Sequence, residues 1–128
     1  MIQCLIVDDD IDDQEVFLLC VKQVIKDVIC LTANSGVEAL SIFKNNSEYK
    51  PDFIFIDVNM PKMNGIDCLR SLTQFEQLSD TRIFMYSTTS DNAVVELSKE
   101  LGARDFIVKP SKILEIKNKL TELLMTPQ

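Results

Sequence analysis

Histidine is absent from this chain of 128 residues. Its absence removes the commonest general base and the commonest protein ligand for transition metals. It also excludes a Ser-His-Asp or Cys-His nucleophile system, because both depend on an imidazole. Any acid, base or metal chemistry of this chain therefore has to come from other side chains.

Long hydrophobic runs and a signal-peptide pattern are also missing. No apolar stretch approaches the ~20 residues that a membrane-spanning helix needs, so we expect no membrane segment. The four cysteines show no CxxC spacing, and each lies in an apolar stretch: Cys4, Cys20, Cys30 and Cys68. We interpret them as buried thiols of a reduced, cytoplasmic protein, with a redox sensor or a disulfide pair as the alternative.

Basic residues are too few for a nucleic-acid binder. The chain carries 13 basic and 20 acidic residues, for a net charge of −7. This balance opposes binding to nucleic acid or to anionic membranes and favours cations or basic partner surfaces. Length and an ordinary globular composition predict a single domain over residues 1–128, with 126–128 as a short tail and no output domain.

Four short apolar runs each end on reactive polar side chains. Runs of this length, rich in β-branched and aromatic residues, are typical of strands buried on both faces. The runs are 4–7, 53–56, 83–86 and 106–108, and they end on Asp8 and Asp9, Asp57, Ser87 and Thr88, and Lys109 and Pro110. A fifth run, 28–32, ends on Ala33 and Asn34 and carries no reactive group.

The segments between these runs have the apolar period of helices. Ser35 is the expected N-cap of the second helix, and Gly102 is the expected C-cap of the fourth. The five predicted stripes are Val16, Leu19, Cys20 and Val24; Val37, Leu40 and Phe43; Ile66, Leu69, Leu72 and Phe75; Ala93, Val94, Leu97 and Leu101; and Ile113, Ile116, Leu120, Leu123 and Leu124. The pattern is strand-helix five times over, or (βα)5.

Strict alternation of strand and helix predicts an α/β fold with a parallel sheet and right-handed crossovers. Five strands do not close a barrel, so a doubly wound open sheet remains, as a three-layer sandwich. The common order for such a flavodoxin-like sheet is 2-1-3-4-5, which we adopt as a prior of the fold class. This order makes the four strands with reactive ends consecutive neighbours.

Neighbouring strands lie ~4.8 Å apart, so Asp8 and Asp9 should face Asp57 across one strand spacing. Three carboxylates this close repel one another unless a cation intervenes, and oxygen ligands favour Mg²⁺. Lys109 and Ser87 come from the next strands. A cation, a lysine and a hydroxyl around a carboxylate form a constellation for phosphoryl transfer, with Asp57 as the nucleophile.

These motifs together resemble a response-regulator receiver domain of the stand-alone kind found in chemotaxis signalling. The resemblance covers essentially the whole chain. The motifs are LIVDDD at 5–10, FIFIDVNMPKMNG at 53–65, FMYST at 84–88 and DFIVKP at 105–110.

The resemblance implies a role for each acidic residue of the site. Asp57 corresponds to the phosphoacceptor. Asp9 corresponds to a direct Mg²⁺ ligand, Asp8 to a ligand acting largely through metal-bound water, and the backbone carbonyl of Asn59 to a further ligand. Ser87 corresponds to the switch hydroxyl that moves to the phosphoryl group.

The same resemblance implies that Lys109 bridges to a phosphoryl oxygen or to Asp57, and that Pro110 follows a cis peptide bond. Phe106 occupies the position of the switch aromatic residue. Thr88 stands where many members have a smaller residue, and its bulk is expected to slow access to the site. Asn59 and Thr89 flank the path of the attacking water. Ser111 replaces a frequent apolar residue.

The implied function is two-component phosphorelay signalling. Without histidine, the chain needs a donor in trans, either a histidine kinase or a histidine phosphotransfer domain. Phosphorylation would switch a surface of the fourth helix, fifth strand and fifth helix for an unidentified downstream protein. We expect a monomer or weak dimer that promotes only its own phosphorylation and dephosphorylation and is otherwise no enzyme.

Four alternatives to this interpretation need to be considered. Asp10, Asp12 and Asp13 suit a helix N-terminus as cap and dipole partners. An EF-hand loop fails because its glycine and glutamate positions hold other residues. A haloacid-dehalogenase-like phosphatase would use Asp8 as nucleophile and Asp10 as acid/base, but it leaves Asp57 without a role. The last alternative is a receiver-fold interaction module that works without phosphorylation.

Overall fold

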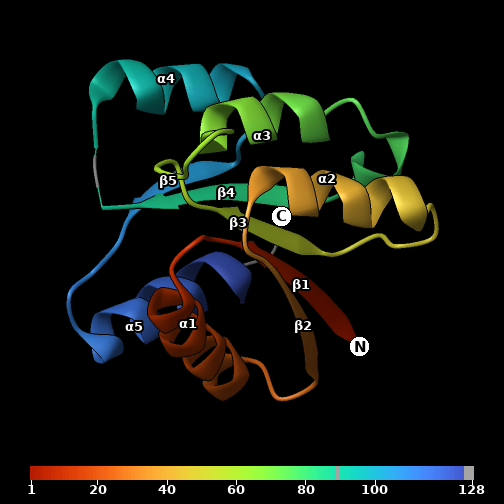
Figure 1. The fold of residues 1–128 in the computed structure, drawn as a ribbon. Helices are drawn as coiled ribbons and strands as arrows, with labels where there is room; N and C mark the ends of the chain where they lie inside the picture. Colours follow the sequence, from red (N-terminus) through yellow and green to blue (C-terminus); the bar gives the residue numbers. More distant parts are fainter. Residues whose placement is uncertain (89, 126–128) are drawn as a thin grey trace.

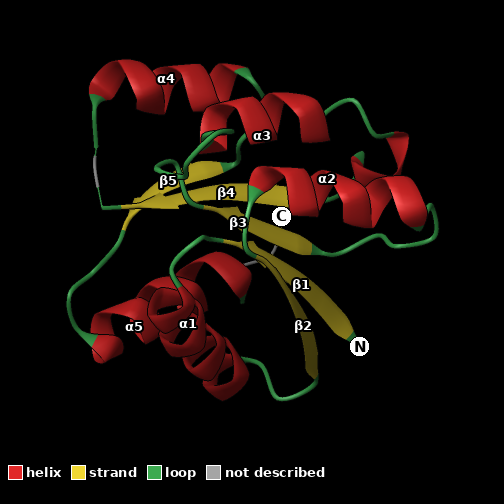
Figure 2. Ribbon diagram, in the orientation of Figure 1, coloured by secondary structure: helices red, strands yellow, loops and turns green. Residues whose placement is uncertain are grey.

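A computed structural model describes residues 1–88 and 90–125 of the chain. Strands and helices alternate along the sequence, as the (βα)5 pattern predicts (Figures 1 and 2). The strands are β1 (Ile2–Val7), β2 (Val28–Ala33), β3 (Phe53–Ile56), β4 (Arg82–Ser87) and β5 (Asp105–Val108). The helices are α1 (Ile11–Val24), α2 (Gly36–Asn45), α3 (Gly65–Leu72), α4 (Asn92–Glu100) and α5 (Ile113–Leu124), with a short 3-10 turn, η1 (Glu76–Leu78).

The five strands form one parallel sheet in the order β2-β1-β3-β4-β5, which confirms the predicted order. In this order, Val7 of β1 pairs with Ile56 of β3, so the residues that follow them emerge side by side. Ser87 of β4 pairs with Val108 of β5 in the same way. The predicted reactive ends therefore lie along one edge of the sheet.

Helices cover both faces of the sheet (Figure 1). On one face, α2, α3 and α4 pack over a core cluster that contains Leu5, Ile54 and Met85. On the other face, α1 and α5 pack over a second cluster that contains Phe55 and Phe84. The two clusters fix the sheet between helix layers, and this three-layer sandwich holds the strand ends in place.

The predicted apolar stripe of α1 is half right, because Cys20 is buried and Val24 packs against the core, but Val16 and Leu19 do not belong to the buried face. Val16 and Leu19 are exposed, whereas Phe17, Cys20 and Val21 are buried. The buried face is selected by aromatic packing, because the Phe17 ring lies 4.7 Å from the Phe55 ring and 4.8 Å from the Tyr86 ring, between centroids. The sequence around these positions is apolar on nearly every side, so periodicity alone could not choose between the two faces.

The second strand is less fully covered than its neighbour in the sheet. Ile29 and Leu31 of β2 are exposed, although the neighbouring β1 residues Leu5 and Val7 are fully buried. β2 is the outermost strand of the sheet on its side. The run at 28–32 therefore forms the predicted strand at the edge that the predicted order gives it, and one of its faces is incompletely covered.

Local signals at the helix ends behave as predicted. The Ser35 side chain accepts a hydrogen bond from the backbone of Glu38 at 3.1 Å and so caps α2. Gly102 follows α4 with a φ of 113°, which glycine adopts without strain. In the described part of the chain, no helix is long and apolar enough to cross a membrane.

Candidate functional site

Three carboxylates meet at the carboxyl edge of the sheet. Asp8 and Asp9 follow β1, and Asp57 follows β3. One ligand oxygen from each lies within 4.8 Å of the others, so the group could hold a metal ion. Asp8 and Asp57 are buried, at 3% and 8% exposure, while Asp9 is exposed. The structure thus brings together the three acids that the strand ends predicted.

Asp8 is held rigidly in this cluster. Its Oδ1 accepts a hydrogen bond from the backbone N–H of Asp10 at 2.9 Å, and its Oδ2 accepts one from Lys109 Nζ at 3.0 Å. Its own backbone N–H donates to the carbonyl of Ala33 at 3.0 Å. Both carboxylate oxygens already have donors, which suits a residue that contacts a metal through water better than one that binds it directly.

A buried glutamine that the sequence analysis did not identify holds the backbone of Asp8 in place. Gln14 Nε2 donates to the backbone carbonyl of Asp8 and to Asn34 Oδ1, the latter at 2.7 Å. Asn34, at the end of β2, carries no reactive group but helps to hold the glutamine that contacts Asp8. The only sequence signal for this contact was a glutamine on an otherwise apolar helix face.

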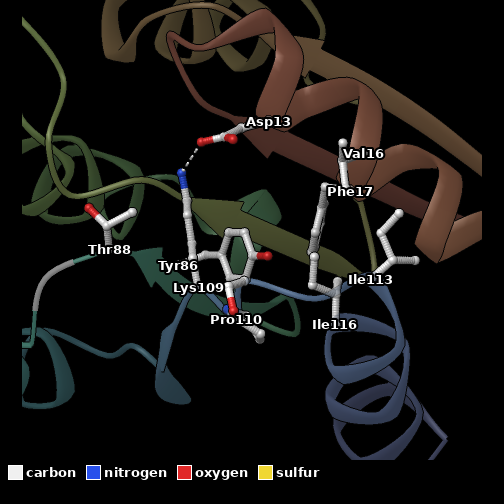
Figure 3. A pocket seen from close by; sticks show the side chains of 10 residues that line it. Asp13, Val16, Phe17, Tyr86, Thr88, Lys109, Pro110, Ile113 and Ile116 are labelled. Atoms are coloured by element: carbon white, nitrogen blue, oxygen red, sulfur yellow. Dashed lines mark hydrogen bonds and ion pairs between the residues drawn. The ribbon is translucent and has the colours of Figure 1, made fainter.

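Lys109 contacts three carboxylates from its position after β5. Its Nζ lies 2.9 Å from Asp13 Oδ2, 3.0 Å from Asp8 Oδ2 and 3.8 Å from Asp57 Oδ2. Figure 3 shows the Lys109 side chain reaching Asp13 at the start of α1. Burial lowers the pKa of the ammonium, but hydrogen bonds to Asp13 and Asp8 outweigh it, so the pKa is raised overall. Lys109 is therefore a permanent cation at this edge.

The contact between Lys109 and Asp13 revises the interpretation of the acidic run. Asp13 was expected only as a partner of the helix dipole, together with Asp10 and Asp12. Asp10 does cap α1, since its Oδ1 accepts the backbone N–H of Asp13 at 3.1 Å. Asp13 itself instead forms an ion pair with Lys109, a residue distant in sequence whose side chain no local pattern could place beside it.

Asp57 is the least compensated of the buried acids. Its Oδ1 accepts a hydrogen bond of 3.3 Å from the backbone N–H of Asn59, and Lys109 stays beyond hydrogen-bond distance. Desolvation raises the pKa of Asp57 to about 6, against the opposing effect of Lys109 and with a further rise from Asp8. A nearby cation, or a covalent bond that removes its negative charge, would stabilise such a buried carboxylate.

Ser87 lies fully buried at the end of β4. Asn59 Nδ2 donates to its Oγ across 3.4 Å, and its carbonyl accepts the backbone N–H of Lys109 at 2.7 Å. The hydroxyl is thus next to Asn59 in the loop after Asp57. Thr88 is exposed at the rim of the site. Thr89, the other residue expected beside the water path, lies outside the described residues.

At the β5 end the structure tests the expectation for Pro110, while the switch role of Phe106 stays a prediction. Within the described residues no peptide bond is cis, so the expected cis bond before Pro110 is wrong. The trans isomer is intrinsically favoured by about 0.5–1 kcal/mol, and with it Lys109 already reaches its partners. Phe106 is half-buried and packs against the core cluster under α2, α3 and α4.

The loop after β3 depends on one glycine. A Cβ on Gly65 would collide with the carbonyl oxygen of Asp57 and would approach the Cα of Val58 to 2.6 Å. The backbone N–H of Gly65 also donates to the Val58 carbonyl at 2.8 Å. The start of α3 therefore lies directly against the backbone of Asp57, and only glycine permits this approach. The Asn64-Gly65 pair in the sequence was the signal for it.

The donor chemistry of the acid cluster suits a hard divalent cation. The atoms that it offers to a metal are carboxylate oxygens, and the backbone of Asn59 lies beside Asp57, to which its N–H donates at 3.3 Å. Such oxygen sites favour Mg²⁺ or Ca²⁺ over softer metals. Burial is the main cause of the raised pKa of Asp57, and Asp8 and Asp9 add to it; a cation at the site would act against this rise.

Fold and site together define a class of protein. The family model for the response regulator receiver domain matches residues 4–121. The chain therefore belongs to the response regulator receiver domain family, whose members are modules of two-component signalling.

Relatives of known name agree with this membership. Chemotaxis protein CheY of Thermotoga maritima is 31% identical over 118 residues, covering 88% of this chain and 94% of that protein. The structure of Vibrio cholerae CheY4 superposes with a TM-score of 0.82 at 27% identity, over 96% of this chain and 98% of that one. The CheY of a Borrelia burgdorferi CheX–CheY–BeF3–Mg complex gives a TM-score of 0.74 at 28% identity, over 98% and 90%.

Membership in this family replaces the phosphatase alternative. In that alternative Asp8 is a nucleophile and Asp10 an acid/base. In the structure, both Asp8 oxygens accept hydrogen bonds and the Asp10 side chain caps α1. Neither residue is free to act on a substrate in the way the alternative requires.

Proposed function

We propose that this receiver domain accepts a phosphoryl group on Asp57 from a phosphohistidine donor in the presence of Mg²⁺. The observation that carries the proposal is the state of Asp57. It is a buried carboxylate with a pKa raised to about 6, beside Asp8 and Asp9 and within 3.8 Å of Lys109. No other carboxylate in the described residues combines burial, weak compensation and this position.

The transfer is a displacement at phosphorus. A carboxylate oxygen of Asp57 forms the new P–O bond while the P–N bond to the donor imidazole breaks, and the imidazole leaves with the electron pair and takes up a proton. The product is an acyl phosphate. Because this chain has no histidine, the donor must be a histidine kinase or a histidine phosphotransfer domain.

Mg²⁺ would be held by Asp9, Asp57 and the backbone carbonyl of Asn59, with Asp8 contacting it through water. When bound, it supplies positive charge to the phosphoryl oxygens. Lys109 supplies a second positive charge from the other side. Asp8 fixes the position of Lys109 through their 3.0 Å contact, which keeps the ammonium close to the reacting carboxylate.

Phosphorylation would then change the surface of the domain. It adds about −1.5 to −2 charges and several strong acceptor oxygens beside Asp57. Ser87 and Lys109 are the donors that can reach these oxygens, and both are attached to strands β4 and β5. Phe106 of β5 and Val94 and Leu97 of α4 pack against the same core cluster. A shift of either strand end would therefore reach the α4–β5–α5 surface.

That surface would be the contact for the downstream partner. The related Borrelia CheY forms a complex with CheX, and for this chain we propose a protein partner whose identity is open. With a net charge of −7, nucleic acid is not a suitable partner. The proposal treats residues 1–128 as one receiver domain whose own surface carries the signal, as a monomer or weak dimer.

The test is phosphorylation by a small donor. We expect acetyl phosphate with Mg²⁺ to add one phosphoryl group, detected by intact-protein mass spectrometry, and EDTA to prevent it. Asp57→Asn should abolish the adduct. Asp80→Asn removes the same charge from an exposed position far from the site and should leave it intact. An undiminished adduct in Asp57→Asn, or none in the wild type, would contradict the proposal.

A further inference from the structure

We propose that Asp13 is a positioning residue that holds Lys109 away from Asp57 and competes with the phosphoryl group for the lysine. The inference rests on the proposed phosphorylation of Asp57. It concerns a residue of the first turn of α1 that lies outside the acid cluster of Asp8, Asp9 and Asp57.

The distances show where Lys109 is held. Its Nζ donates to Asp13 Oδ2 at 2.9 Å and to Asp8 Oδ2 at 3.0 Å, both within hydrogen-bond range. The nearest Asp57 oxygen is 3.8 Å away, which is an ion-pair distance without a hydrogen bond. Two of the three ammonium protons are therefore committed to other carboxylates before any phosphoryl group arrives.

The two committed contacts differ in how easily they can break. The Asp8 side chain is 4% exposed, so water could not replace Lys109 as its partner, and breaking this contact would leave a buried charge uncompensated. The Asp13 side chain is 45% exposed and can return to water. When new acceptor oxygens form on Asp57, Asp13 is therefore the partner that Lys109 releases, and Asp8 is the one that it keeps.

The position of Asp13 also sets the direction in which the Lys109 side chain points. Figure 3 shows Asp13 on α1 and Lys109 after β5 facing each other at the rim of a cavity of about 440 Å³, whose wall includes Phe17 and Tyr86. The Lys109 ammonium lies 5.4 Å from the centre of the Tyr86 ring. The Asp13 contact draws the ammonium toward α1, and its release frees the lysine to turn to Asp57.

A purely local role for Asp13 makes a different prediction. An acidic residue in the first turn of a helix stabilises it through the helix dipole, and this effect is shared by every acid of that turn. Asp12 offers the matched control, because it lies in the same turn with the same charge and is exposed. Of these two residues only Asp13 contacts Lys109. An effect of the Asp13 substitution that the Asp12 substitution does not share would therefore show that Asp13 and the phosphoryl group compete for Lys109.

The experiment measures binding of beryllofluoride, which mimics a phosphoryl group on a carboxylate, by ¹⁹F NMR in the presence of Mg²⁺. We expect Asp13→Asn to lower the half-saturating concentration roughly threefold to fivefold, as the loss of a half-exposed ion pair allows. Asp12→Asn should change it by less than about twofold. Asp13→Glu, which can still reach Lys109, should stay near the wild-type value.

Three outcomes would overturn the proposal. Equal shifts in Asp13→Asn and Asp12→Asn would reduce the effect to general charge, and weaker binding in Asp13→Asn would give Asp13 the opposite role. A value for Asp13→Glu equal to that of Asp13→Asn would assign the effect to side-chain shape. If the wild-type protein bound no beryllofluoride, the proposed phosphorylation of Asp57 would be contradicted as well. If it binds and only the variants behave otherwise than expected, the role of Asp13 alone is contradicted.

Discussion

At the scale of single residues, the site is a problem of charge. Asp8, Asp13 and Asp57 all lie within 4 Å of the same ammonium, that of Lys109. The two nearer acids take its hydrogen bonds, whereas burial raises the pKa of Asp57 to about 6 against the effect of Lys109. The proposed phosphoacceptor is therefore poorly accommodated in its charged form, and this carries a cost in stability.

That cost predicts a pH-dependent effect of Asp57→Asn in metal-free protein. The pKa of Asp57 is raised in the folded state from 3.8 to about 6, so ionisation favours the unfolded chain. The penalty is absent below the unfolded pKa, grows between 3.8 and about 6, and is fully present above. Asn carries no such charge, so the variant should be more stable by about 1–3 kcal/mol at neutral pH.

Urea unfolding over a pH series with EDTA measures this difference. The gain should shrink toward zero as the pH falls below about 4, where the wild-type carboxyl is protonated in both states. Asp80→Asn, at an exposed position, should show no comparable trend. A wild type more stable than Asp57→Asn at neutral pH would mean that the folded protein stabilises the carboxylate, contrary to our account.

The sequence predicted single residues where a buried strand ended, and failed where a contact depended on tertiary structure. Asp8, Asp57 and Lys109 follow strands, and the structure brings them together. Asp13 follows no strand, and its partner is far away in the chain. The trans peptide bond before Pro110 could not be predicted from the sequence either, because the two isomers of such a bond are close in energy.

At the scale of elements, the loop from β3 to α3 sets the position of Asp57. Gly65 starts α3 in contact with the Asp57 backbone, and Asn64 caps that helix by accepting the backbone N–H of Asp67 at 2.9 Å. The helix is thereby attached directly to the reactive residue. A disturbance of the helix start should reach the site without any change in its charged groups.

Gly65→Ala should therefore lower both stability and phosphorylation. The added methyl group meets backbone atoms of Asp57 and Val58, which cannot rotate away, so we expect a loss of about 2–4 kcal/mol in the free energy of unfolding. Gly36→Ala is the control, since its methyl group meets the flexible Met63 side chain and should cost about 1 kcal/mol or less. Chemical denaturation and acetyl phosphate labelling measure both.

Equal losses in the two glycine variants would show that the close approach at Gly65 contributes nothing of its own to stability or phosphorylation.

The elements themselves were well predicted in type and order, because strand runs and helix stripes are long and regular. The buried face of α1 was predicted only in part, because a helix with Val16, Phe17, Leu19 and Val21 in sequence offers several apolar faces. Only the aromatic rings of the sheet, Phe55 and Tyr86, choose among them.

At the scale of the whole molecule, strand order turns four separate strand ends into one site. The order β2-β1-β3-β4-β5 makes β1, β3, β4 and β5 consecutive neighbours. It places the acids at one end of this row and the lysine at the other, with Ser87 between them. We therefore expect charge added at Asp57 to act on β4 and β5, as the proposed switch requires.

The most direct test of the account locates the phosphoryl group on the chain. Borohydride reduces an acyl phosphate to an alcohol, which converts a phosphorylated aspartate to homoserine and leaves free carboxylates and phosphoserine unchanged. After treatment with acetyl phosphate and Mg²⁺, peptide mass spectrometry should find homoserine at position 57 alone. Homoserine at position 8 or 9, or a stable phosphate on Ser87 with Asp57 unmodified, would contradict the assignment of Asp57 as the phosphoacceptor.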